Sequence, residues 1–221
     1  MKPRFTKPSR APLSRERVIQ AALELADAGG TDRLTMRALA AELGVEAMSL
    51  YNHVRNKEDL LDGLVEAVVA KIDLPRAEGD WQGEMQRRAN AMRSVFLAHP
   101  WAPPLIVGRI NTGPHMLSLI EATLSCLRAA GFSTVQADHV MNALDSYLYG
   151  FHLLERSFPL EPERYAEAAR AFLPSIDADR YPHFAELAQV VADGRHDGVN
   201  HMAFGLDRLL RALEQERHGQ G

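Results

Sequence analysis

Four polar side chains between positions 51 and 57 of this 221-residue chain are suited to phosphates and nucleic-acid bases. The phenol of Tyr51 and the imidazole of His53 can donate hydrogen bonds to a phosphate oxygen. Lys57 adds an ammonium group at the predicted start of a helix, where free backbone amides also favour an anion. Asn52 carries both a donor and an acceptor, so it can pair with an adenine edge or with a phosphate. The sequence leaves open that Tyr51 serves partly as a packing residue.

A second group of candidate contact residues precedes this one. Thr35 stands where its hydroxyl can cap a helix and also reach a phosphate. Arg37 lies nearby on the exposed side and offers charge-assisted hydrogen bonds. The first turn of the next predicted helix contains Ala47, Met48 and Ser49. This is the part of a recognition helix that usually meets base edges, so the two groups together indicate binding to double-stranded DNA.

Two short helices joined by a tight turn must position these residues. Leu39 and Leu43 lie on the apolar face of the first helix, and Gly44 follows, where a left-handed residue can end a helix without steric cost. The second helix, about residues 47–54, keeps Leu50 inward. Two helices of this length around a glycine turn form a helix-turn-helix, whose second helix fits the major groove.

A further helix on each side completes this unit. The preceding helix begins after Ser14, a good N-cap, and ends at Gly29-Gly30. The following helix begins after Asn56 and carries a wide apolar face to about Ile72. Because this face is wide enough to touch both the helix-turn-helix and the rest of the chain, we predict that this helix links the two mechanically.

The charges are divided unevenly along the chain. Residues 1–57 contain ten Lys or Arg and six Asp or Glu, whereas residues 58–221 contain fifteen and twenty-three. A basic N-terminal part on an acidic body suits one end that faces DNA and one that faces solvent. The basic residues 1–12, which include three prolines, either reach phosphates or a minor groove or form a solvated tail.

Composition and motifs argue against several other classes of protein. The single cysteine, Cys126, rules out an internal disulfide and fits a reducing cytosol. No apolar run reaches the ~18 residues needed to cross a bilayer, and the N-terminus lacks an apolar signal core, so we expect a cytoplasmic protein. The G-x-S-x-G, P-loop and H-E-x-x-H motifs are missing. We therefore expect no enzymatic activity, no cofactor and no structural metal.

The runs LTMRALAAELGV, SLYNHV and NKEDLL, taken together, resemble the DNA-binding domain of the tetracycline-repressor (TetR) family of bacterial transcriptional regulators. The pattern is long and ordered and covers roughly Leu13 to Ala70. Beyond it, the resemblance weakens to an all-helical C-terminal half with GDWQ at 79–82 and AAGFS at 129–133.

The resemblance implies an all-α fold, with an N-terminal three-helix helix-turn-helix DNA-binding domain and a C-terminal helical ligand-binding and dimerisation domain. Tyr51, His53 and Lys57 match the family's backbone-contacting positions, and residues 47–49 match its base-reading positions. Glu46 stands where many members have a Ser or Thr cap. The expected domains are a flexible basic arm over 1–12, the helix-turn-helix domain over 13–56, the linking helix over 57–72 and an effector-binding and dimerisation domain over 73–221.

The resemblance also implies an effector pocket in the C-terminal half, where prolines break the helices near apolar and polar side chains. The candidate effector-binding residues are Trp101, Leu105, His115, Met116, His139 and Asn142. Each histidine alone is better explained as a hydrogen-bonded core or surface residue. Arg88 and Thr123 stand where the tetracycline repressor has an Asn and a Gln that bind its drug, so the effector is of unknown identity.

Two helices, roughly 134–157 and 199–216, carry surplus apolar surface and suggest a four-helix seam between two copies. The alternative is that one monomer fills both faces. The resemblance implies the homodimer, which explains how one helix-turn-helix reads a two-fold operator. We therefore predict a repressor released from a palindromic operator by a small molecule. The alternative is a ligand-independent DNA-binding or architectural protein without an effector pocket.

Overall fold

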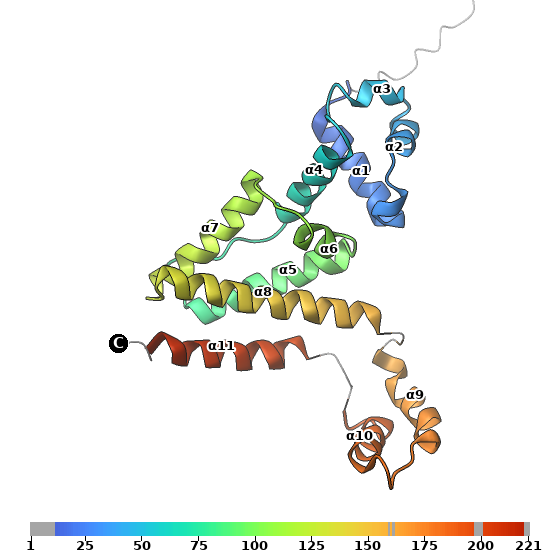
Figure 1. Ribbon diagram of the computed structural model, residues 1–221, viewed down its shortest axis with the longest axis vertical. Helices are drawn as coiled ribbons and strands as arrows, with labels where there is room; N and C mark the ends of the chain where they lie inside the picture. Colours follow the sequence, from blue (N-terminus) through green and yellow to red (C-terminus); the bar gives the residue numbers. More distant parts are fainter. Residues whose placement is uncertain (1–11, 159, 161, 197–200, 219–221) are drawn as a thin grey trace, which may run out of the picture. The chain divides into compact units, whose positions relative to one another are not determined.

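The computed structural model describes residues 12–158, 160, 162–196 and 201–218, and every regular element within these ranges is a helix (Figure 1). The predicted all-α class is confirmed. The chain divides into two compact units, Met1–Cys126 and Leu127–Gly221. The first unit contains α1 (Arg15–Gly29), α2 (Met36–Leu43), α3 (Ala47–Leu50), α4 (Lys57–Val69), α5 (Trp81–Ala98), α6 (Ala102–Val107) and most of α7 (Pro114–Ala129).

Side-chain caps start four helices in the first unit, and at α5 the Asp80 carboxylate accepts from the Gly83 amide at 2.9 Å. Ser14 Oγ accepts from the Arg17 amide at 3.3 Å before α1, and Thr35 Oγ1 accepts from the Ala38 amide at 3.1 Å before α2. Asn56 Oδ1 accepts from the Asp59 amide at 2.8 Å before α4. Each cap satisfies an amide that has no partner within its helix, which is why the predicted helix starts are confirmed.

The helix-turn-helix has the predicted glycine turn and a shorter second helix. Gly44 ends α2 in the left-handed conformation, with φ 65° and ψ 42°. The prediction extended the second helix to Val54, whereas α3 ends at Leu50 and residues 51–53 form turns. In these turns the amides of His53 and Val54 both donate to the Leu50 carbonyl, at 2.9 and 3.0 Å. The chain therefore keeps a helical path although the regular helix is only one turn long.

Apolar packing holds the elements of this unit together. α1 contacts both α2 and α4. Leu39 of α2 and Leu50 of α3 are fully buried, as are Leu60 and Leu64 of α4. Burying one such side chain stabilises a fold by roughly 1.5–3 kcal/mol, so these leucines fix α3 against its supports. α4 also contacts α6, as expected of a helix that links the helix-turn-helix to the rest of the unit.

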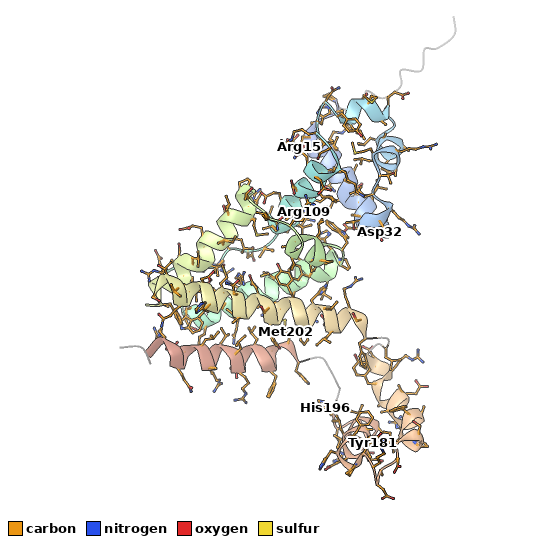
Figure 2. All side chains as sticks on the ribbon, viewed as in Figure 1. Arg15, Asp32, Arg109, Tyr181, His196 and Met202 are labelled. Carbon is orange, nitrogen blue, oxygen red and sulfur yellow. The ribbon has the colours of Figure 1, made fainter. Side chains whose placement is uncertain are left out.

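The second unit contains α8 (Thr134–Ser157), α9 (Tyr165–Phe172), α10 (Pro182–Ala192) and α11 (Met202–His218). A capping box of Ser133 and Gln136 starts α8. α11 lies antiparallel beside α8: the Tyr147 hydroxyl donates to the Met202 carbonyl at 2.8 Å, and Arg217 donates to the Ala130 carbonyl at 2.6 Å (Figures 1 and 2). α9 and α10 form a second pair. None of the helices in the described ranges is both long and apolar enough to span a membrane.

Candidate nucleic-acid interface

The starts of α2 and α4 present three of the candidate DNA contacts. Thr35 is exposed although its hydroxyl oxygen caps α2, so the hydroxyl proton is still available to a phosphate. Arg37 is exposed in the first turn of the same helix. Lys57 is the exposed first residue of α4 and lies beside the amides of its first turn. Both helix starts can therefore attract an anion.

The one-turn helix α3 presents its first residues outward and its last residue inward. The side chain of Met48 is 76% exposed, whereas Leu50 is fully buried. Ala47 and Ser49 are half-buried on either side of Met48. The first three residues of α3 therefore present a methyl group, a thioether and a hydroxyl to a binding partner.

The turn after α3 carries the remaining candidates. Tyr51 is 45% exposed, so neighbouring residues cover slightly more than half of its surface. Asn52 is exposed and His53 is half-buried. Thus the structure places all nine predicted contact residues on α3, on the turn after it, or at the starts of α2 and α4.

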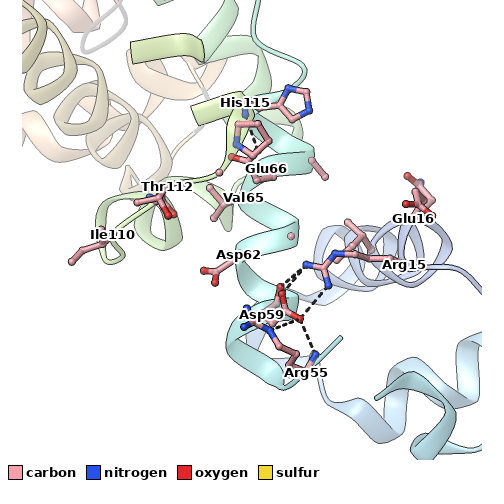
Figure 3. Close-up of a pocket in the computed structure, with 17 residues that line it drawn as sticks. Arg15, Glu16, Arg55, Asp59, Asp62, Val65, Glu66, Ile110, Thr112 and His115 are labelled. Atoms are coloured by element: carbon pink, nitrogen blue, oxygen red, sulfur yellow. Dashed lines mark hydrogen bonds and ion pairs between the residues drawn. The ribbon is translucent and has the colours of Figure 1, made fainter. Parts of the chain in front are cut away.

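An ion pair that sequence reasoning missed lies directly behind this turn. Arg15 of α1 donates to Asp59 of α4 at 2.8 and 3.1 Å (Figure 3). It also donates to the His53 carbonyl at 2.9 Å. The hydrogen bond from Arg15 lowers the pKa of Asp59 from 3.8 to about 2, and the same bond raises the pKa of Arg15. An acidic residue beside a buried leucine in α4 was the available signal, but nothing in the sequence named its partner.

Acidic residues of α4 also hold the segment that joins α6 to α7. Arg109 donates to Glu58 at 2.5 Å and to Asp62 at 2.6 Å, and these hydrogen bonds raise the pKa of Arg109. The Arg109 side chain is 18% exposed, whereas Glu58 and Asp62 are 66% and 52% exposed. Both carboxylates are thus open to solvent, and each ion pair contributes little to stability.

The next acidic residue along the same face of α4 serves as the N-terminal cap of α7. The Glu66 carboxylate accepts from the amides of His115 and Met116, at 2.8 and 3.1 Å. Gly113 lies so close to this carboxylate that a Cβ atom there would collide with it. Glu58, Asp62 and Glu66 are spaced four residues apart, so one stripe of α4 holds the whole 109–116 segment.

A cleft of about 710 Å³ opens between α1, α4 and the 110–115 segment (Figure 3). Ile19, Val65 and Ile110 are among its apolar lining residues. Its charged lining residues include Arg15 and Asp59, which are paired with each other. They also include Glu66, whose carboxylate accepts from backbone amides at the start of α7. In the parts of the chain that are described, no cluster of three or more His, Cys, Asp or Glu could hold a metal ion.

Two family models match this chain. Residues 18–64 match the model described as "Bacterial regulatory proteins, tetR family", and residues 74–217 match "Tetracyclin repressor-like, C-terminal domain". The chain belongs to the TetR family. The predicted family is confirmed, and the protein is a DNA-binding transcriptional regulator rather than an enzyme.

Relatives of known name and structure agree over almost the whole chain. The HTH-type transcriptional repressor DrrR1 of Streptomyces coeruleorubidus is 32% identical, over 94% of this chain and 81% of the relative. The class E tetracycline repressor protein of Escherichia coli is also 32% identical, over 94% and 96%. The crystal structure of apo ActR from Streptomyces coelicolor aligns with a TM-score of 0.81 and 27% identity, over 96% of this chain and all of that one.

The six candidate effector residues of this TetR-family protein have different surroundings. Trp101 is buried, and its indole N–H donates to Asp27 of α1 at 2.7 Å. Met116 is buried, Leu105 is half-buried, and His115 is exposed at the edge of the cleft. His139 and Asn142 are exposed on α8 in the second unit, where Asn142 donates to the Asp138 carbonyl. The cleft in the first unit therefore includes His115 but none of the other five.

The Asp27 contact belongs to a polar cluster around the buried His99, which sequence reasoning also missed. The Nδ1 atom of His99 lies 2.7 Å from the Asp27 carboxylate, and its Nε2 atom lies 2.9 Å from Lys71 Nζ. The His99 side chain is only 7% exposed. The cluster thus ties α1 and the residues after α4 to the corner between α5 and α6.

The second unit has an apolar pocket of about 280 Å³ between α9 and α10 and the segment before α9. Its lining consists of aromatic and aliphatic side chains, among them Phe158, Tyr165, Phe172, Phe184 and Leu187. Phe172 and Phe184 are about half exposed and lie edge to face, 6.2 Å apart. None of the six candidate effector residues lines this pocket.

Proposed function

We propose that this TetR-family regulator is a repressor that binds a palindromic operator as a homodimer and is released by a small molecule. The observation that carries the proposal is the exposed first turn of α3, flanked by the amide-rich starts of α2 and α4. A recognition helix needs this arrangement to enter a major groove while phosphates bind on both sides. The name of DrrR1, a transcriptional repressor, supports repression over activation.

The contacts divide into two kinds. Thr35 and Arg37 at the start of α2, and Tyr51, His53 and Lys57 around the start of α4, bind phosphates and fix the register of the protein on DNA. Ala47, Met48 and Ser49 meet base edges, where the exposed Met48 supplies an apolar contact to a thymine methyl group. Asn52 completes the set by binding a base edge or a phosphate.

The homodimer forms through the free faces of α8 and α11. Val135 and Leu153 on α8, and Phe204 on α11, are each about two-thirds exposed. Gly150 of α8 faces open space, where a Cβ atom would meet nothing within 4 Å. Large exposed apolar side chains beside a bare backbone surface suit a close approach by a second copy. Such a dimer would place its recognition helices about 34–36 Å apart, in successive major grooves.

The effector acts by binding the DNA-free arrangement of the dimer better than the DNA-bound one. ActR has been solved with actinorhodin and with (S)-DNPA, and a single-residue variant of TetR from Acinetobacter baumannii has been solved with minocycline. We infer that this chain also binds a small organic molecule, in its 73–221 domain. Its candidate binding residues are Trp101, Leu105, His115, Met116, His139 and Asn142.

Selection of bound duplexes from a random DNA pool tests the DNA-binding half of this proposal. We expect enrichment of a palindrome, and a loss of affinity for it in Lys57→Ala. Since each phosphate contact contributes about 0.9 to the slope of log K against log salt concentration, this variant should lower the slope by about one. Arg180→Ala, at an exposed arginine of the second unit, is the matched control and should bind as the wild type does. Binding without enrichment of any sequence would contradict the proposal.

Titration of the selected duplex complex with small molecules tests the effector half. Actinorhodin and minocycline are the first probes, because relatives were solved with them. Release of DNA by a molecule that also binds the free protein is the expected result. A ligand-independent DNA-binding protein is the competing function, and it would bind neither probe nor any member of a wider library.

A further inference from the structure

We propose that Arg15 and Asp59 are positioning residues, which hold the turn that carries His53 and Lys57 in the conformation needed for phosphate contact. This inference rests on the proposed function, because it assigns these two residues a role through the DNA contacts themselves. Neither residue was among the predicted contacts, and neither needs to touch DNA.

The guanidinium of Arg15 holds two points of the chain at once. Its Nη1 atom donates to one oxygen of Asp59 at 3.1 Å, while Nη2 donates to the other oxygen at 2.8 Å (Figure 3). Nη1 also donates to the His53 carbonyl at 2.9 Å. The turn after α3 is thereby fastened to both α1 and α4. His53 cannot rotate its peptide plane without breaking its bond to Arg15.

Asp59 holds the rest of the same segment. Its carboxylate accepts from the Arg55 amide at 2.8 Å, and its own amide donates to the Asn56 side chain at 2.8 Å. Consequently, the backbone on both sides of Asn56 is fixed, and Lys57 follows immediately. The His53 carbonyl and the Arg55 amide are thus both bound by the side chains of one ion pair.

The fork shape of arginine matters more here than its charge. A planar guanidinium can bind both oxygens of a carboxylate and a nearby carbonyl together, whereas the ammonium of a lysine is a point donor on a flexible stem. The Arg15 side chain is 41% exposed, so solvent screens much of the charge attraction, while Asp59 is 10% exposed. The pair is therefore better suited to fix an orientation than to supply a large part of the stability.

Arg15→Lys separates these two roles, because it keeps the charge and removes the fork. We expect this variant to fold but to bind the selected operator at least about tenfold more weakly. Since a mispositioned Lys57 loses its phosphate, the slope of log K against log salt should also fall by about one. A fold defect alone would reduce the amount of active protein without changing this slope.

A double-mutant cycle with Lys57→Ala decides the question. If Arg15 acts by positioning Lys57, then Lys57→Ala should cost much less affinity in the Arg15→Lys background than in the wild type. Additive losses with an unchanged salt slope would overturn the inference. Asp59→Asn, which keeps the shape of the side chain, provides a second route and should show the same non-additivity.

Arg87→Lys is the matched control. Arg87 of α5 makes a similar fork, to Glu84 at 2.5 Å and to the Leu74 carbonyl at 2.6 Å, and its pKa is likewise raised by its carboxylate partner. This variant should leave operator affinity and the salt slope unchanged, whereas an equal loss would contradict a specific role for Arg15. If the wild type itself selects no palindrome, the proposed function fails. If the wild type and Lys57→Ala behave as proposed but the cycle is additive, only this inference fails.

Discussion

Asp59 is a carboxylate in an almost buried position that nevertheless stays ionised. Desolvation alone would raise its pKa, but the hydrogen bonds from Arg15 and the Arg55 amide outweigh that cost and bring the pKa to about 2. The group is therefore charged at every pH at which DNA binding is measured. The contribution of the Arg15–Asp59 pair to stability is therefore tested at acid pH, where Asp59 takes up a proton.

Asp59→Asn should lower the free energy of unfolding at pH 7 by on the order of 2 kcal/mol, an upper value because Arg15 is partly exposed. Since the pKa is lower in the folded protein than its usual 3.8, the stabilisation is present above about pH 4 and disappears as the pH falls towards 2. Urea unfolding of both proteins at pH 7 and near pH 2.5 measures this. An equal difference in stability at both pH values would refute the assignment.

Gly113 is the residue whose missing side chain allows α7 to be capped. In Gly113→Ala the new Cβ atom should displace the Glu66 carboxylate from the His115 and Met116 amides, lowering the free energy of unfolding by about 1–2 kcal/mol. Chemical denaturation measures the loss. The control is Glu66→Ala: once the carboxylate is gone, adding Gly113→Ala should cost almost nothing further, and a full additional loss would show that the glycine matters for another reason.

At the scale of helices, α4 joins the parts of the first unit by three kinds of contact. Its apolar face packs on α1 and α6, its acidic stripe holds Arg109 and the α7 start, and Lys71 beyond its end meets the buried His99. The carboxylates that bind Arg109 are exposed, so those ion pairs are weak, whereas the exposed Lys71 meets a buried imidazole. α4 is therefore attached to its neighbours along its whole length.

α8 and α11 meet closely at Gly205, beside Tyr147. In Gly205→Ala the Cβ atom would collide with the Tyr147 ring and hydroxyl, so we expect a loss of about 1–3 kcal/mol from overpacking. Thermal or urea unfolding measures it. Tyr147→Phe removes only the hydrogen bond to the Met202 carbonyl and should cost less, about 1 kcal/mol. If Gly205→Ala is neutral, the two helices can separate slightly without penalty.

Short-range chemistry explains what the sequence could reveal about these helices. A cap such as Ser14, Thr35 or Asn56 bonds to an amide three residues away, so its role is visible in the sequence itself. The Arg15–Asp59 pair joins residues 44 positions apart, and the Glu66 cap of α7 joins residues 49 apart. Such pairs depend on how helices pack, and no local pattern distinguishes them from ordinary surface charges.

The same limit applies to the candidate site. The nine proposed DNA contacts could be named together because one contiguous motif, from Thr35 to Lys57, contains them all. The candidate effector residues come from separate segments of the chain. Their proximity in the sequence could not show that the indole N–H of Trp101 donates to Asp27. His139 and Asn142 even belong to a different compact unit from Trp101.

For the whole molecule, the strongest test concerns its assembly. Because Gly150 faces open space, Gly150→Arg should leave the fold of one chain intact but place a long cation in the proposed dimer face. We expect a monomer by analytical ultracentrifugation and a large loss of operator affinity, since each half-site would then bind alone. Gly150→Ala is the control for helix propensity. If the Gly150→Arg protein remains a dimer, the dimer interface does not include the surface around Gly150.

The hydrogen bond between Trp101 and Asp27 lets tryptophan fluorescence report on the contact between α1 and the corner between α5 and α6. The chain contains two tryptophans, Trp81 and Trp101, and both are buried. In Trp81→Phe a single tryptophan remains, whose indole N–H donates to a carboxylate of α1 and whose ring lies edge to face with His99, 6.0 Å away. Its emission would change as soon as α1 left the α5–α6 corner. The protein thus carries its own unlabelled reporter, which can be read in real time while an operator or an effector is added.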